Sequence, residues 1–219
     1  MNPEDRHALE AGISLREEYG GKVTVLSMGP RQAEHALREA LAMGADEAIL
    51  LTDTAFAGAD TYATAFTLAQ AIRKLGGYDL IICGREASDG NTAQVGPQLA
   101  ECLDIPQITY VSHLKLEDSK KLVARRNLEY GYETVETSLP ALITVVKELN
   151  KPRYPSVWSI VSAFREREVI YWGLEDLGVD RNEVGLRGSR TRVRRTYTPQ
   201  PKGEIVWLDG PIQEIARAL

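Results

Sequence analysis

The sequence predicts an α/β fold in which helices cover both faces of a parallel sheet. Strand-like and helix-like segments alternate through the first 83 residues, and the strands are short apolar runs typical of buried parallel sheets. The chain has 219 residues, 43% of them apolar, which is enough for a full core. Ligands of such Rossmann-like sheets bind at the carboxyl ends of the strands. The first half of the chain is therefore the expected place for a binding site.

The elements of this half follow from periodicity and end signals. Apolar residues recur at helical spacing as far as Tyr19. Asn2 and Pro3 precede them as a cap residue and a proline at the first helical position. Strand, helix, strand, helix and strand then follow at residues 22–28, 30–43, 47–51, 60–75 and 78–83. Asp60 is the expected cap of the third helix. The connecting loops, residues 27–30, 53–60 and 84–92, should meet at one edge of the sheet.

The pattern changes after Pro106 to short alternating segments separated by charged turns. Residues 113–116, 122–128 and 132–137 predict a small antiparallel insertion. The apolar run 139–146 suits a buried strand that returns to the main sheet, and residues 150–154 follow as an exposed loop. From residue 175 periodicity is weak and arginines gather. We therefore expect an α/β domain over residues 1–174 and an extended, solvated or partner-bound arm over residues 175–219.

Composition argues against several classes of protein. No apolar run approaches the roughly 20 residues of a bilayer span and no leader precedes Arg6, so neither membrane insertion nor export is expected. A net charge of −5, with no aromatic residues among the clustered arginines, argues against a nucleic-acid partner. Two cysteines and three isolated histidines form no disulfide framework, triad or metal-ligand pattern, so we expect no metal and a cytoplasmic location.

The most informative segment runs from Asp79 to Pro97, where an apolar strand leads through a glycine-punctuated polar loop into a helix. A helix start exposes unpaired N–H groups and partial positive charge, so the turn at residues 90–92 is a candidate phosphate site. Gly84 and Gly90 permit close approach of another molecule. The alternative is an ordinary connection in which a side chain of residues 89–92 caps the helix, and local chemistry leaves both open.

Residues 84–97, G-R-E-A-S-D-G-N-T-A-Q-V-G-P, closely resemble the signature of the beta subunit of electron transfer flavoproteins. Further segments resemble the same family in order and spacing: N-P-E-D at 2–5, V-L-S-M-G-P at 25–30, A-L-A-M-G-A-D at 40–46, P-R-Y-P-S at 152–156 and D-L-G-V-D at 176–180. The resemblance implies an adenine nucleotide alpha hydrolase-like fold. It also implies a heterodimer with an alpha subunit that carries FAD, and a nucleotide of this chain's own in the three loops.

The resemblance leaves two branches for that nucleotide. In one it is AMP with a structural role. In the electron-bifurcating branch it is a second FAD, which takes a hydride from NADH and sends one electron to a high-potential flavin and the other to ferredoxin or flavodoxin. Residues 58–65, G-A-D-T-Y-A-T-A, resemble the bifurcating subunits, where two hydroxyl residues meet the flavin diphosphate. Here these are Thr61 and Thr64, which share a helix face and either donate O–H bonds to a pyrophosphate or solvate the first turn.

The resemblance therefore implies an FAD site, with AMP as the alternative. Its expected residues are Asn2, Ser27, Met28, Asp60, Thr61, Thr64, Cys83, Gly84, Arg85, Asp89, Gly90, Asn91, Thr92, Gln94 and Val95. Gly90 replaces the acidic residue that the AMP branch tends to carry. Arg85 either stabilises reduced, anionic flavin or forms a salt bridge to Glu86 or to the partner subunit. No catalytic side chain is expected, because the cofactor performs the chemistry.

Two late segments also resemble the bifurcating branch, residues 157–169 and 185–193. By resemblance Tyr154, Val157 and Trp158 dock an acyl-CoA or related dehydrogenase, and an exposed apolar side chain flanked by aromatic rings is a sensible anchor. The arm from residue 175 is then expected to contact the alpha subunit.

The chain also departs from the family pattern. Members usually begin with a valine-rich strand followed by K-Q or K-R, which lies mid-sheet and helps hold the adenosine, whereas this chain starts at the N-P motif. We expect unpaired backbone and weaker cofactor affinity as a result. The chain likewise stops at Leu219, before the family's final helix generally ends. A different class, a homodimeric ATP-binding module similar to universal stress proteins, predicts a glycine-rich phosphate loop after the last strand, and residues 145–155 carry none.

Overall fold

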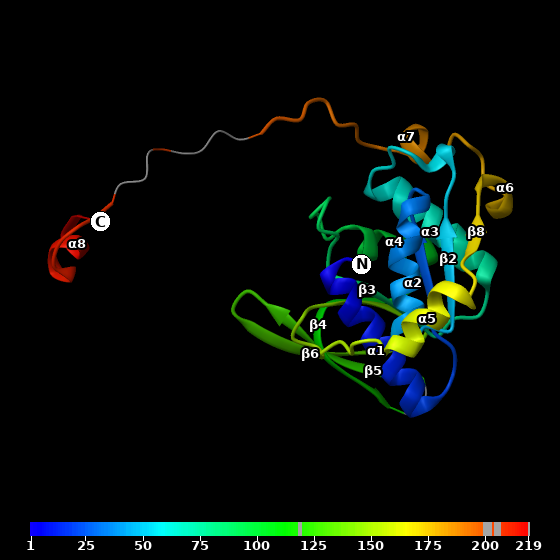
Figure 1. Ribbon diagram of the computed structural model, residues 1–219, viewed down its shortest axis with the longest axis horizontal. Coiled ribbons are helices and arrows are strands. Elements are labelled where there is room, and N and C mark those ends of the chain that lie inside the picture. The colour runs from blue at the N-terminus through cyan, green and yellow to red at the C-terminus, as the bar shows by residue number, and fades with distance from the viewer. Residues whose placement is uncertain (118–119, 199–202, 204–206, 219) are drawn as a thin grey trace.

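The computed structural model describes residues 1–117, 120–198, 203 and 207–218, and it has the predicted α/β architecture (Figure 1). The helices are α1 (Pro3–Tyr19), α2 (Glu34–Met43), α3 (Thr61–Leu75), α4 (Val95–Leu103), α5 (Val157–Arg165), α6 (Leu174–Leu177), α7 (Gly185–Gly188) and α8 (Ile212–Ala218), with short 3₁₀ turns η1 (Arg31–Ala33) and η2 (Thr54–Phe56). The strands are β1 (Thr24–Met28), β2 (Glu47–Leu51), β3 (Leu80–Gly84), β4 (Gln107–Glu117), β5 (Lys121–Leu128), β6 (Gly131–Ser138), β7 (Ala141–Val145) and β8 (Ile170–Trp172).

The strands form a parallel sheet and a mixed sheet. The parallel sheet has the order β1-β2-β8. The mixed sheet has the order β3-β7-β4-β5-β6, in which β7 runs parallel to β3 and β4 while β4, β5 and β6 are antiparallel. The antiparallel insertion and the buried return strand β7 are thus confirmed, since all five residues of β7 are buried.

The parallel strands lie in two sheets instead of the single sheet predicted. Both β1 and β3 are edge strands, and no backbone ladder joins them among the described residues.

Two helices hold the sheets together from opposite faces. Helix α1 packs Leu9 and Ile13 against α2 and β2, and Ala8 against β4 and β7. Helix α3 does the same on the other face, with Ala65 and Ala69 against the mixed-sheet side and Ala71 against β2. Each helix therefore spans the break with one apolar side.

The C-terminal region first returns to the body and then leaves it. Leu174, Leu177, Val179 and Val184 pack against the cluster around Phe56. Beyond this segment the chain extends away, and α8 lies apart from the body (Figure 1). Apolar side chains along it are open to solvent: Val193 (84%), Tyr197 (77%), Trp207 (84%) and Ile212 (83%). The extended arm of the predicted fold is therefore present, and its partner and domain boundary stay predictions. No helix in the described part of the chain is long and apolar enough to cross a bilayer.

Candidate cofactor site

Asp60 caps α3, as predicted. Its Oδ1 accepts a hydrogen bond from the Ala63 amide at 2.9 Å, and its Oδ2 accepts bonds from the Thr191 amide (2.7 Å) and hydroxyl (2.9 Å). Burial opposes ionisation of this carboxyl, but the N–H and O–H donors outweigh burial and lower its pKa. The same carboxylate therefore starts α3 and holds the beginning of the arm.

The residues that follow the second and third predicted loops meet at Thr61 and Gln94. The Thr61 hydroxyl donates a hydrogen bond to Oε1 of Gln94 at 3.3 Å, across 33 residues of sequence. Thr64 lies one turn further along α3, where its amide donates to the Asp60 carbonyl at 2.9 Å. Because Gln94 immediately precedes α4, the two helix starts lie side by side.

Asn2 occupies the cap position of α1, but its side chain bonds the third loop instead of the helix amides. Its Nδ2 donates to the carbonyl of Glu86 at 3.0 Å and its Oδ1 accepts from the amide of Ser88 at 3.2 Å. Asn2 thus takes the predicted cap position, but its side chain makes no capping bond, because its amide group is already paired with Glu86, Ser88 and the Asp5 carboxylate. This contact fixes the loop that follows β3.

Gly84 ends β3 directly beneath the first turn of α1. Its amide donates to Oδ1 of Asp5 at 2.8 Å, and a Cβ here would lie 2.7 Å from that oxygen and 2.9 Å from the Asp5 nitrogen. The first turn of α1 therefore occupies the space that a side chain at Gly84 would need. Burial, and secondly the charge of Asp5, raise the pKa of the adjacent Cys83 thiol to about 12, so it stays protonated at neutral pH.

Helix α4 begins later than predicted. It starts at Val95 with Gln94 as its cap residue, and neither Asp89 nor the residues up to Thr92 cap it. Asn91 and Ala93 have φ values of 49° and 53°, left-handed conformations that cannot continue into a helix. The Asp89 carboxylate instead accepts the Gly90 amide at 2.8 Å. The helix-start donors therefore lie at Val95 and Gly96, and Pro97 has none.

Arg85 forms the salt bridge to Glu86, which was one of the alternatives predicted from the sequence. Its Nη2 pairs with Glu86 and lies 3.2 Å from Oε1 of Glu4. The guanidinium also lies 6.0 Å from the ring centre of Tyr110, while its buried Nε has no hydrogen-bond partner among the described residues. One N–H donor of Arg85 therefore stays available.

Sequence analysis missed Tyr110 and Glu4 as neighbours of this site. Tyr110 has a φ of 59°, unusual for a residue other than glycine, at the irregularity where β4 changes strand partner. Although Glu4 belongs to the N-P-E-D motif, no local sequence signal places either residue beside Arg85, because both reach it only through the fold.

Ser27 and Met28 lie at the carboxyl end of β1, in the other sheet. Met28 packs with the cluster of Leu51 and Phe56. Among the described residues, no side-chain hydrogen bond joins Ser27 or Met28 to Thr61 or Gln94. Met28 shares that cluster with Phe66 and Leu68 of α3, so the end of β1 packs against the helix that carries Thr61.

The predicted docking residues gather where the exposed loop enters α5. Tyr154, Val157 and Trp158 are 92%, 76% and 84% exposed. Ile160 and Phe164, at helical spacing from Val157, continue an apolar exposed face along α5. These side chains are available for contact with another protein.

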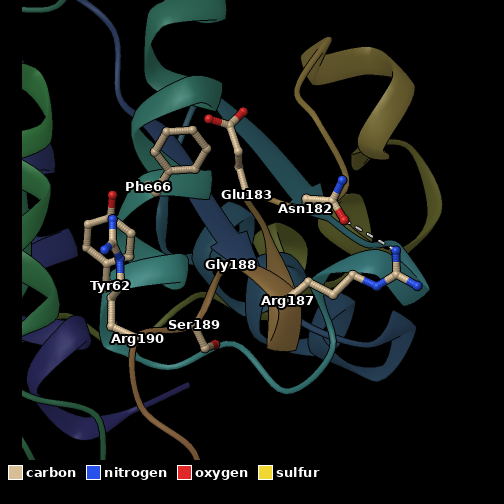
Figure 2. A pocket seen from close by; sticks show the side chains of 8 residues that line it. All are labelled: Tyr62, Phe66, Asn182, Glu183, Arg187, Gly188, Ser189 and Arg190. Carbon is tan, nitrogen blue, oxygen red and sulfur yellow. Dashed lines mark hydrogen bonds between the residues drawn. The ribbon is translucent and has the colours of Figure 1, made fainter.

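Figure 2 shows a separate cavity of about 330 Å³ beside α3. Tyr62 and Phe66 of α3 face the segment of residues 182–190 across it, and the Arg190 guanidinium lies 4.8 Å from the Tyr62 ring centre. None of the predicted cofactor residues lines this cavity. Within the described ranges, no three His, Cys, Asp or Glu side chains cluster as metal ligands would.

Comparison with known proteins assigns the family. The family model of the electron transfer flavoprotein domain matches residues 1–176. The chain is 58% identical over 221 residues to an electron transfer flavoprotein subunit beta of Thermoanaerobacterium thermosaccharolyticum, covering 100% of this chain and 84% of the relative. It is 52% identical over 216 residues to the subunit beta of Clostridium acetobutylicum, covering 99% and 82% of the two chains. It is also 48% identical over 221 residues to the caffeyl-CoA reductase-Etf complex subunit CarD of Acetobacterium woodii, covering 100% and 84%.

These matches confirm the resemblance drawn from the sequence motifs. The chain belongs to the electron transfer flavoprotein family and is of its beta-subunit type.

Proposed function

We propose that this chain binds FAD at the paired starts of α3 and α4 and passes electrons through the FAD of an alpha subunit in flavin-based electron bifurcation. The observation that carries the proposal is the hydrogen bond between Thr61 and Gln94, which joins the segment that resembles the bifurcating branch, residues 58–65, to the family signature of residues 84–97. AMP in the same place is the alternative.

The residues at these helix starts fit a phosphate-bearing cofactor. Thr61 and Thr64 supply hydroxyls, and the first amides of α4 at Val95 and Gly96 have no intrahelical acceptor. Arg85 adds positive charge and a buried Nε–H without a partner. Hydroxyl, amide and guanidinium donors beside aligned helix dipoles are suited to a diphosphate.

When bound, FAD supplies the hydride and one-electron chemistry, and the protein supplies binding and electrostatics. The Thr64 hydroxyl and the α4 amides would hold the diphosphate, and the Thr61 hydroxyl would join them by turning its O–H from Gln94 to the phosphate. The guanidinium of Arg85, itself held by Glu4 and Glu86, places a cation near the cofactor and favours negative charge there. Asn2 keeps the loop after β3 in place through Glu86 and Ser88.

The proposed partners follow from the exposed surfaces. We assign the arm with Tyr197 and Trp207 to the alpha subunit, since an extended segment of exposed apolar side chains needs a partner to bury it. Tyr154, Val157 and Trp158 dock an acyl-CoA or related dehydrogenase. NADH is the donor, and ferredoxin or flavodoxin the low-potential acceptor. Two free cysteines suit a reducing cytoplasm.

Counting cofactors in the intact heterodimer tests this proposal. Co-expression with the alpha subunit, extraction of the nucleotides and chromatography should give two FAD per heterodimer. One FAD together with one AMP overturns FAD binding and bifurcation by this chain. A homodimer of this chain with bound ATP and no affinity for the alpha subunit overturns the heterodimer itself.

Valine substitutions test the placement. In the heterodimer, Thr61→Val with Thr64→Val should remove the flavin of this chain and leave that of the alpha subunit, because valine keeps the shape but loses both hydroxyl donors. Thr134→Val on the exposed β6 is the matched control and should retain both flavins. Retention of both flavins in the double variant would place the cofactor elsewhere.

A further inference from the structure

The segment that presents the docking residues has little regular structure of its own. Residues 150–156 form the second part of the connection from β7 to α5 and contain no helix or strand. Among the described residues, no backbone-to-backbone hydrogen bond ties residues 151–155 to the rest of the chain. A segment without such bonds stays in one place only if its side chains hold it.

Arg153 provides that attachment through Glu10 of α1. Its Nε lies 2.9 Å from Oε2 and its Nη2 2.9 Å from Oε1 of Glu10, the two parallel bonds of a bidentate pair. The backbone amide of Arg153 donates to the same carboxylate at 3.0 Å. Glu10 thus binds both the main chain and the side chain of this one loop residue.

Glu17, two turns further along α1, binds the other side of the Arg153 guanidinium. Its oxygens accept bonds from Nη1 at 2.6 Å and Nη2 at 2.9 Å. His7 adds a tie on the same helix face, since the side-chain amide of Asn150 donates to its carbonyl at 2.9 Å. Residues 7, 10 and 17 share one side of α1, so the helix forms a continuous seat for the loop.

Glu10 is unusual because its side chain is only 9% exposed on a surface helix. Burial disfavours its ionised form, but the bonds from Arg153 outweigh that cost and lower the pKa of the carboxyl. A buried carboxylate is retained only when it is fully paired, and its partner here is a loop residue that lies 143 positions away.

We propose that Arg153 is a positioning residue that locks residues 150–156 onto α1 and thereby presents Tyr154, Val157 and Trp158 to the dehydrogenase in a preorganised arrangement. The inference rests on the docking role proposed above for these three side chains. A loop that is already ordered loses less conformational freedom when it binds, and this strengthens association without any new contact.

The test uses the purified heterodimer with the alpha subunit and compares Arg153→Met with Arg16→Met. Arg16 lies on α1, the helix that carries Glu10 and Glu17, but it pairs with Asp46 at 2.7 Å and not with the loop. It is therefore the matched control. Hydrogen exchange of a peptide spanning residues 147–156 should speed up about tenfold or more in Arg153→Met and stay unchanged in Arg16→Met. The KM for an acyl-CoA dehydrogenase should rise about tenfold, with flavin content and kcat at saturation unchanged.

Two further variants keep the test decisive. Glu17→Gln removes the exposed half of the attachment without leaving a buried charge, so it should fold and show a smaller increase in loop exchange. Arg153→Lys keeps the positive charge but loses the planar guanidinium. Hydrogen exchange of the loop should therefore be slower than in Arg153→Met and faster than in the wild type. Unchanged loop exchange in Glu17→Gln and in any folded Arg153→Met protein overturns the proposal.

The docking role is tested separately by Val157→Asp. If that variant leaves the KM for the dehydrogenase unchanged while Arg153→Met still loosens the loop, the docking assignment fails and the positioning by Arg153 stands. If Val157→Asp raises the KM and loop exchange is insensitive to Arg153, the docking assignment stands and the positioning role fails.

Discussion

At the scale of single residues, Gly84 occupies a point of the site where backbone atoms leave no room for a side chain. It ends β3 where the first turn of α1 crosses it, and its missing side chain leaves room for the Asp5 main chain and carboxylate. The requirement is steric and not conformational, because the backbone at Gly84 is not left-handed. The loop that follows therefore depends on a glycine two residues before Glu86.

Gly84→Ala should lower the free energy of unfolding by about 1–3 kcal/mol, because the new Cβ meets backbone atoms that cannot move aside without shifting α1. Chemical denaturation followed by circular dichroism measures the change. Gly90→Ala is the matched control, since nothing lies within 4 Å of a Cβ there, and it should be nearly neutral. Equal stability of the two variants would show that α1 is not seated on β3 as described.

At the scale of elements, the sequence predicted best those segments whose ends carry local signals. Helix α1 spans the predicted residues, because Pro3 at its start and Gly20 after its end are short-range signals. Strand β2 and helix α3 were likewise placed closely, the latter through Asp60. Strand β8 was not predicted, because its three residues are a strand only through pairing with β2.

The candidate site was predictable to the extent that it depends on motifs. Thr61 and Gln94 came from sequence resemblance, and the fold brings them together. The attachment of Arg153 to Glu10 was not visible, because it joins residues 143 positions apart and neither lies in a pattern of its own. The start of α4 was misplaced because the loop holds Ala93 in a left-handed conformation that its residue type rarely adopts and that no local signal marks.

The cap of α3 makes a testable contribution to stability with a defined pH dependence. Asp60→Ala should lower the free energy of unfolding by about 1 kcal/mol at pH 7, because the Ala63 amide loses its acceptor. Because the pKa of Asp60 is lowered in the folded protein, its charge stabilises the fold above the ordinary value of about 3.9. That contribution is lost as the pH falls through the folded pKa.

Urea unfolding of the wild type and of Asp60→Ala at pH 7 and pH 3 measures this effect. The difference between the two proteins should narrow at pH 3, while Asp60→Asn, which retains an oxygen acceptor, should fall between them at pH 7. A difference that does not change with pH would mean that the charge of Asp60 contributes nothing.

At the scale of the whole molecule, the break between β1 and β3 divides the protein into two sheets that share helices instead of a backbone ladder. The five residues of β1 and of β3 are all half-buried, whereas β7 is completely buried. The two sheets are held together by the apolar sides of α1 and α3. Side-chain packing fixes the position of one sheet relative to the other less strictly than a hydrogen-bonded strand pair would.

Hydrogen exchange followed by NMR should show this division. In the isolated chain, the amides of β1 and β3 that point away from β2 and β7 should exchange much faster than those of β2 and β7, because they have no ladder partner; the Gly84 amide, which donates to Asp5, is the exception. Strands β2 and β7 are internal controls, since each is paired on both sides. Equal protection of all four strands would indicate that the two edges are paired in solution.

The double use of Asp60 has a consequence for assembly. One carboxylate binds both the first turn of α3, where we place the diphosphate, and Thr191, where the arm leaves the body. A nucleotide that favours one arrangement of this carboxylate also favours one position of Thr191. Nucleotide binding then changes the affinity of the arm for the alpha subunit by some factor. Thermodynamic reciprocity then requires the alpha subunit to change nucleotide affinity by the same factor. Cofactor loading and subunit assembly would then be a single coupled equilibrium, measurable from either side.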